Sequence, residues 1–222
     1  MKIMRTAITS LVLLLLSVPL LHAQDLSKYR NFSLGMSLAD LSRQIDAKPA
    51  DVRVLHQQPA RIEELNWWPR LSGYPLQPEA IREVLFSFCD GKLYRIYVTY
   101  DDTATAGMTP EDMARAISAT YGAPSTPDAR ISLPTGGDAI AEKVLDRWED
   151  SEHSINLLRS SFSNTFALVM YTKQLNAQAE AASSAASKLE QQGAPQREVD
   201  RKKKESDDLE ASRVKNMKTF HP

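Results

Sequence analysis

Histidine and cysteine side chains are the first candidates for catalysis or metal binding, because imidazoles and thiolates react near neutral pH. After residue 23, the 222-residue chain contains His56, His153, His221 and a single cysteine, Cys89. His153 directly follows the acidic run Glu149–Glu152. These oxygen donors could assist hydrolysis at His153, but their spacing matches no familiar metal-ligand pattern. We expect no metal ion and no cofactor, and we retain a hydrolase centred on His153 as one alternative.

Sequence signatures of the common enzyme classes do not occur in this chain. It has no serine-hydrolase elbow, zinc-protease helix, phosphate-binding loop or dinucleotide fingerprint. Cys89 has no histidine near it in the sequence, and a predicted hairpin tip is a poor place to activate a thiolate. A single cysteine also excludes an internal disulfide bond, so the apolar core must hold the fold. The sequence therefore favours a protein that is not an enzyme.

Two adjacent tryptophans are the strongest candidates for ligand contact. Trp67 and Trp68 lie in the proline-rich segment Gln57–Glu79, which is predicted to be mostly irregular, and Tyr74 lies nearby. Large amphipathic rings stack on sugars or anchor protein partners. The same rings equally cover a core or shield a sheet edge, and this structural role is the first expectation. As binding residues, Trp67, Trp68 and Tyr74 would contact a protein partner or, alternatively, a glycan or the cell wall.

The charge balance argues against nucleic acid as a partner. The chain has 27 Lys and Arg against 28 Asp and Glu, a net charge of −1. Without Lys2 and Arg5 the balance is 25 to 28, or −3. Folded domains that bind phosphate backbones carry a clear excess of basic residues, which this chain lacks.

The first 23 residues have the order of a secretory signal peptide. Lys2 and Arg5 precede the apolar run Leu11–Leu16, and a small residue, Ala23, follows. Such a segment is shorter than a membrane span and is removed after export. We expect cleavage after Ala23, a periplasmic or secreted mature protein, and no stable membrane span afterwards. Because no cysteine follows the apolar run, a lipoprotein anchor is not expected.

Two short amphipathic helices are predicted from their start signals. Ser37 can cap the first helix, with Asp40 returning the bond. Thr109 and Asp112 form a stronger capping box for the second helix, which Gly122 ends. The apolar stripes to be buried are Leu38, Leu41 and Ile45 in the first helix and Met113, Ile117 and Tyr121 in the second.

A β-hairpin over Ile81–Tyr100 is the best-supported element, since strand alternation and turn residues agree over its whole length. A two-residue Asp90-Gly91 turn would place Arg95 among phenylalanines, at a high desolvation cost. We therefore predict a three-residue loop, Cys89–Gly91, with Gly91 in the left-handed conformation and a bulge. The face that this register buries consists of Val84, Phe86, Tyr94, Ile96 and Val98, with Phe88 and Tyr100 beside them.

Two further strands are predicted over 144–159 and 166–172, after a loop over 125–137. Ile155 and Leu157 are expected to face the core. The pattern of the last strand leaves two choices for its inner face. These are Phe166, Leu168 and Met170, or Ala167, Val169 and Tyr171.

The predicted fold class is α+β, an antiparallel sheet with both short helices packed on one face. The elements follow one another as helix, irregular segment and hairpin, and then as helix, loop and hairpin. This order suggests two tandem units, although a chance likeness of two capped helices explains it equally well.

Gly193–Pro195 is expected to end a helix rich in Ala, Gln and Glu. The predicted boundaries are 1–23 for the signal peptide, 24–172 for the domain with possible repeats at 32–100 and 107–172, 173–192 for a projecting helix, and 193–222 for a charged tail, disordered or weakly helical.

Two segments, Phe32–Ser37 and Gly107–Asp112, resemble the helix-start signature of small bacterial envelope proteins. These are the outer-membrane assembly lipoproteins of the SmpA/OmlA type and the related β-lactamase inhibitor proteins. The resemblance spans Phe32–Thr172 and implies helices packed on an antiparallel sheet, repeated in tandem in the inhibitor proteins. It also implies non-catalytic protein binding in the envelope. This chain departs from the group in lacking a lipidation cysteine and cysteine pairs, and no functional residue is carried over.

These features together predict an exported bacterial protein that binds another protein or assists envelope assembly. The alternatives are a cell-wall or glycan-binding protein that uses Trp67 and Trp68, and the hydrolase around His153.

Overall fold

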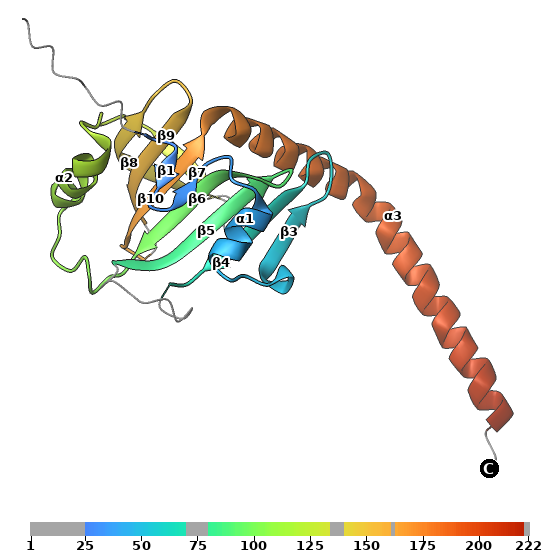
Figure 1. Ribbon diagram of the computed structural model, residues 1–222. Helices are drawn as coiled ribbons and strands as arrows, with labels where there is room; N and C mark the ends of the chain where they lie inside the picture. Colours follow the sequence, from blue (N-terminus) through green and yellow to red (C-terminus); the bar gives the residue numbers. More distant parts are fainter. Residues whose placement is uncertain (1–24, 70–79, 134–139, 161–162, 220–222) are drawn as a thin grey trace, which may run out of the picture.

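A computed structural model describes residues 25–69, 80–133, 140–160 and 163–219. The protein is an α+β fold with an eight-stranded antiparallel sheet, a two-stranded sheet and three α-helices in the described residues (Figure 1). The predicted fold class is therefore confirmed. The elements are β1 (Lys28–Tyr29), β2 (Phe32–Ser33), α1 (Leu38–Gln44), a 3₁₀ turn (Pro49–Asp51), β3 (Val52–His56), β4 (Ile62–Trp67), β5 (Ile81–Cys89), β6 (Lys92–Tyr100), α2 (Pro110–Tyr121), β7 (Arg130–Leu133), β8 (Ile140–Glu149), β9 (His153–Arg159), β10 (Phe166–Thr172) and α3 (Lys173–Thr219).

The strand order of the large sheet is β3-β4-β5-β6-β10-β9-β8-β7. Each short helix is followed along the chain by four strands, and the two sets meet where β6 pairs with β10. In each set the first strand along the chain lies at an edge of the sheet and the fourth lies at its centre. A tandem repeat would produce such an order, so the repeat predicted over 32–100 and 107–172 is compatible with this topology and stays a prediction.

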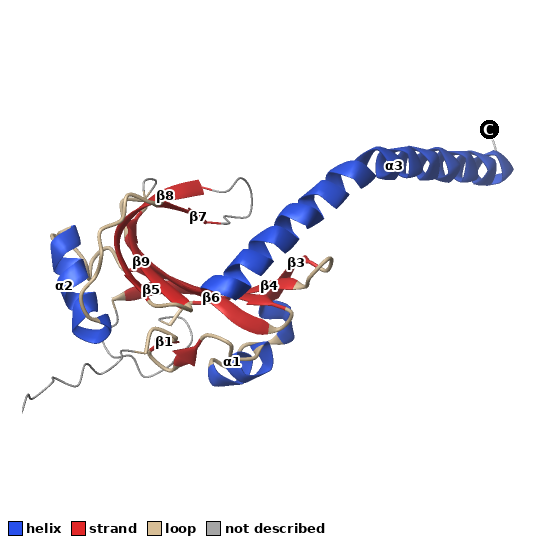
Figure 2. Ribbon diagram, turned by 90° about the horizontal axis from the view of Figure 1, so that it is seen from above, coloured by secondary structure: helices blue, strands red, loops and turns tan. Residues whose placement is uncertain are grey.

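The sheet is curved, with α1 and α2 on its convex side and the start of α3 on its concave side (Figure 2). The main apolar core lies between the convex face and the two short helices. Leu41 of α1 and Met113 of α2 belong to this core together with Phe86 and Ile96 of the central hairpin. Both helices thus cover the same face, as predicted.

The capping residues start both short helices where the sequence places them. The Ser37 Oγ accepts a hydrogen bond from the Asp40 backbone N at 3.1 Å, and the Ser37 hydroxyl, rather than its backbone N, donates to the Asp40 Oδ2 at 2.6 Å. At α2 both bonds of the capping box form, from the Asp112 N to the Thr109 Oγ1 and from the Thr109 N to the Asp112 Oδ2. Gly122 ends α2 with a φ of 81°.

The tip of the central hairpin differs from the prediction. Asp90 and Gly91 form a two-residue turn with φ values of 49° and 76°, and Cys89 pairs with Lys92. Two successive positive φ angles give the turn the twist of the strands that it joins. The predicted three-residue loop at Cys89–Gly91 is therefore wrong.

The bulge lies one pair further from the tip than predicted. Pairing shifts between Ser87 and Phe88, which leaves Tyr94 as the extra residue of β6. Tyr94 consequently lies on the concave side, and its predicted place on the phenylalanine face is wrong. Beyond the bulge, the predicted face is confirmed, because Phe86 opposes Ile96 and Val84 opposes Val98. The bulge places Arg95 opposite Ser87, so Arg95 does not lie on the phenylalanine face.

The second half of the sheet contains one strand and one turn that the sequence does not predict. Residues Arg130–Leu133, expected to be loop, form β7. The predicted strand over 144–159 is two strands, because the Asp150 carboxylate accepts hydrogen bonds from the backbone N atoms of Glu152 and His153 and so forms a tight turn. Ile155 and Leu157 face the core as predicted. In β10 the inner residues are Phe166, Leu168 and Met170.

Helix α3 runs unbroken to Thr219, through Pro195. The predicted break at Gly193–Pro195 is wrong, and the weakly helical alternative describes the tail better than disorder. Ion pairs three and four residues apart, such as Arg201 with Glu198 and with Glu205, support a solvent-exposed helix there. The outer part of α3 projects from the body (Figure 1). No helix in the described part of the chain is long and apolar enough to cross a membrane.

Candidate functional site

The concave face carries an unusual line of polar side chains. Cross-strand pairing places one polar residue on each of seven neighbouring strands, at the same level of the sheet. We call this line the polar row; it consists of Arg53, Glu64, Ser87, Arg95, Tyr171, Ser154 and Glu149. Because side chains alternate along each strand, all of these residues face away from the apolar core.

Two charged residues of the polar row are deeply buried. Arg95 is 5 % exposed; its Nη2 donates to the Ser87 Oγ at 3.4 Å, and its guanidinium lies over the Tyr94 ring. Within the described residues, no carboxylate forms an ion pair with Arg95. Glu64 is 3 % exposed and its Oε2 accepts from Arg53 Nη2 at 2.6 Å, but its Oε1 has no hydrogen-bond partner. Such incomplete pairing of buried charge is costly, so Arg95 and the Glu64 Oε1 are expected to reduce the stability of the fold.

The next row along the concave face is partly accessible. We call it the recognition row; it consists of Asn66, Leu85, Tyr97, Val169, Asn156 and Arg147. Asn66 is exposed, and Leu85, Tyr97 and Arg147 are half-buried. Burial raises the pKa of the Tyr97 hydroxyl, so this ring presents a neutral phenol. Tyrosine and arginine on rigid strands are typical of protein-binding surfaces.

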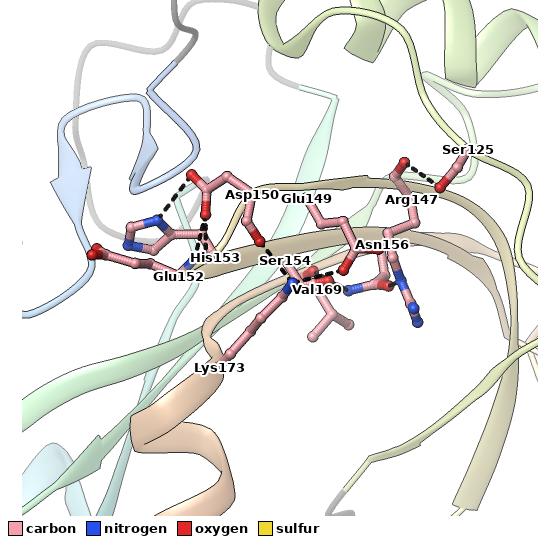
Figure 3. Close-up of polar contacts among 10 residues, drawn as sticks. All are labelled: Ser125, Arg147, Glu149, Asp150, Glu152, His153, Ser154, Asn156, Val169 and Lys173. Carbon is pink, nitrogen blue, oxygen red and sulfur yellow. Dashed lines mark hydrogen bonds and ion pairs between the residues drawn. The ribbon is translucent and has the colours of Figure 1, made fainter.

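Hydrogen bonds fix one end of the recognition row. The Arg147 Nε donates to the Asn156 Oδ1 at 2.7 Å, and the Asn156 Nδ2 donates to the Ser154 Oγ at 3.0 Å (Figure 3). Asn156 and Ser154 are buried. The guanidinium of Arg147 is therefore positioned by buried side chains while remaining partly accessible, which reduces the entropy lost when it binds a partner.

Helix α3 covers one end of the concave face through small side chains. Ala179 and Ala182 pack against Ile62, Cys89 and Tyr94. Cys89 therefore lies beneath α3 at the end of β5, and burial raises the pKa of its thiol. This cover leaves the recognition row outside the α3 contact.

His153 lies at the turn between β8 and β9, beside the root of α3 (Figure 3). Its Nδ1 is 3.3 Å from the Asp150 Oδ2. Backbone N–H groups of His153 and Glu152 and the His153 ring, against the opposing effect of burial, hold the pKa of Asp150 low. No hydroxyl or thiol of a described residue is hydrogen-bonded to His153. The pair thus holds a turn, and the hydrolase around His153 stays a prediction.

The structure separates the two tryptophans that the sequence grouped. The Trp67 ring packs edge-on against Phe32, with ring centroids 5.5 Å apart, and close to Phe86. Trp68 is 42 % exposed. Trp67 thus has the expected structural role, and Trp68 is partly exposed. Tyr74 lies outside the described residues.

Sequence reasoning missed both concave rows. Tyr97 and Arg147 are separated by many residues in the sequence, and the pairing of β6 with β10 brings them into one row. The alternation of Tyr97 and Thr99 with buried Ile96 and Val98 was the available signal, because it marks a second, polar face of the hairpin.

Comparison of the chain with protein-family models, with curated proteins and with solved structures found no match.

Proposed function

We propose that the protein is a non-enzymatic binding module of the bacterial envelope, exported by its N-terminal segment, that recognises a partner protein through the concave face of its sheet. The envelope location rests on the signal-peptide pattern and on the family resemblance of the sequence. The choice of a protein partner rests on the surface itself.

The observation that carries this proposal is the recognition row. Its accessible members, Tyr97, Leu85, Arg147 and Asn66, combine aromatic, aliphatic and cationic contacts on four different strands. The row lies on a curved sheet whose other face is filled by α1 and α2 (Figure 2). A curved, rigid surface with such residues fits a convex protein segment, and its strands need little reorganisation on binding.

Site-specific photo-crosslinking in living cells tests the proposal. A benzophenone amino acid replaces Tyr97, and in a matched control strain it replaces Arg115, which is exposed on α2, on the convex side of the sheet (Figure 2). Irradiation is expected to yield one dominant protein adduct from position 97 and none from position 115. The absence of an adduct at 97, or the same adducts from both positions, would contradict a concave binding face.

A glycan-binding role is the second candidate, and the exposure of Trp68 favours it. Soluble peptidoglycan fragments should then quench tryptophan fluorescence in the wild-type protein but not in Trp68→Phe. Equal quenching in both proteins, or none in either, would remove this candidate.

A further inference from the structure

Helix α3 is fixed to the body at its first residue. The Lys173 N donates to the Glu152 carbonyl at 2.8 Å, and the Lys173 Nζ donates to the Asp150 carbonyl at 2.7 Å. The same Nζ is 2.8 Å from the Glu149 Oε2, and this bond lowers the pKa of Glu149 (Figure 3). The start of α3 therefore stays attached to the turn between β8 and β9 across mildly acidic and neutral pH.

The middle of the part of α3 that lies on the sheet contributes little to the stability of this contact. The buried side chains of α3 are Ala179, Ala182 and Ala186, and Leu175 is partly buried beside the first two. Alanines bury little apolar area, so the contact is weak per turn of helix. The Asn176 Oδ1 is buried there without a hydrogen bond, which weakens the contact further.

Further along α3, the helix around Glu190 meets the end of β3 at a shallow pocket of about 250 Å³. The His56 Nδ1 lies 3.7 Å from the Glu190 Oε1, and it is buried without a hydrogen bond. The other charged group of the pocket is Arg197, whose Nη2 donates to the Glu190 carbonyl at 2.6 Å. The β3 side contributes the uncharged Gln57 and Gln58.

A neutral and a protonated imidazole act differently in this pocket. In the neutral form the buried Nδ1 gains nothing from Glu190 beyond a long dipolar contact. In the protonated form both ring nitrogens carry hydrogen, and the ring attracts the carboxylate. Histidine is the side chain that ordinarily changes charge between about pH 5 and pH 8.

We propose that His56 and Glu190 form a pH-dependent latch that holds α3 against the concave face in mild acid and releases it towards neutral pH. On release, α3 tilts about its root at Lys173 and uncovers the sheet around Ile62 and Cys89. The latch thus sets how much of the concave face is open, whatever that face binds.

Cys89 provides the readout, because it is the single cysteine of the chain and is buried beneath Ala179 and Ala182. The full-length mature protein is labelled with a maleimide at about pH 5.5 and about pH 7.5. Rates are compared between variants at the same pH, so that the thiolate fraction is common to both. In acid, His56→Gln and Glu190→Gln should each label up to about fivefold faster than the wild type, and at neutral pH all three should label alike.

Glu198→Gln is the matched control, since it removes an α3 carboxylate that pairs with Arg201 and not with the sheet. It should label as the wild type does at both pH values. The latch is contradicted if either pocket variant labels like the wild type in acid, or if its excess is the same at both pH values. The second result would indicate a loss of packing without a role for the proton.

Discussion

The two faces of the large sheet are built on different principles. On the convex face, α1 and α2 bury large apolar side chains such as Leu41 and Met113 against the hairpin phenylalanines. On the concave face, α3 buries alanines, and polar groups such as the Glu64 Oε1 are left without partners. The convex face therefore contains most of the apolar core, while the concave face has a smaller apolar cluster, around Val144, Leu158 and Val169, beside its polar rows.

The same leucine-to-alanine change on the two faces should give the largest contrast. Leu41→Ala empties a fully buried site on the convex face and should lower the free energy of unfolding by about 2–5 kcal/mol. Leu175→Ala, at a partly buried site on the sheet-facing side of α3, should cost less than about 1.5 kcal/mol. Urea denaturation of both variants measures the difference. Equal losses would mean that α3 is as firmly packed as α1.

Two arginine-to-methionine changes sharpen the comparison within the concave face. Arg147→Met removes a 2.7 Å hydrogen bond to the buried Asn156 Oδ1 and should cost about 1–2 kcal/mol. Arg95→Met removes a buried guanidinium that has no ion pair in the described residues, so stability should stay level or rise by about 1 kcal/mol. A loss of more than about 2 kcal/mol in Arg95→Met would show that the polar row supports the fold.

The helix caps of the convex side predict a smaller, pH-dependent effect. Hydrogen bonds from the backbone N and the hydroxyl of Thr109 lower the pKa of Asp112 in the folded protein. A lowered folded pKa means that this stabilisation is present above the usual carboxyl pKa and is lost as the pH falls through the folded value. The urea midpoint should therefore fall less between about pH 6 and pH 2 in Asp112→Asn than in the wild type.

The equivalent change at α1 provides a second case. Hydrogen bonds from the hydroxyl of Ser37 and from Arg43 lower the pKa of Asp40. Asp40→Asn should flatten the acid dependence in the same direction. An unchanged acid dependence in both variants would show that these caps do not contribute to acid stability.

Local sequence signals predicted the convex side well. The caps at Ser37 and Thr109 and the stop at Gly122 depend on residues close together in the sequence, so they can be recognised without the fold. The turn at Asp150 escaped prediction because one side chain replaces the glycine that normally marks a tight turn. The unbroken path of α3 through Pro195 escaped prediction because Gly193 and Pro195 are both residues that ordinarily end a helix.

The concave side could not be predicted in the same way. Its rows depend on the register between strands such as β6 and β10, which are far apart in the sequence. Arg95 illustrates the limit. The sequence argued correctly that it must avoid the phenylalanine face, yet gave no sign that it would be buried on the opposite face beside Tyr94.

Native-state hydrogen exchange tests the difference between the two faces most directly. Amides of α2, whose Met113 and Ile117 lie in the convex core, should exchange nearly as slowly as those of β5 and β6. Amides of α3 around Ala179–Ala186, on the concave face, should be protected at least about 100-fold less. Equal protection of α2 and α3 would contradict the account, because both faces would then contribute alike to the stability of the fold.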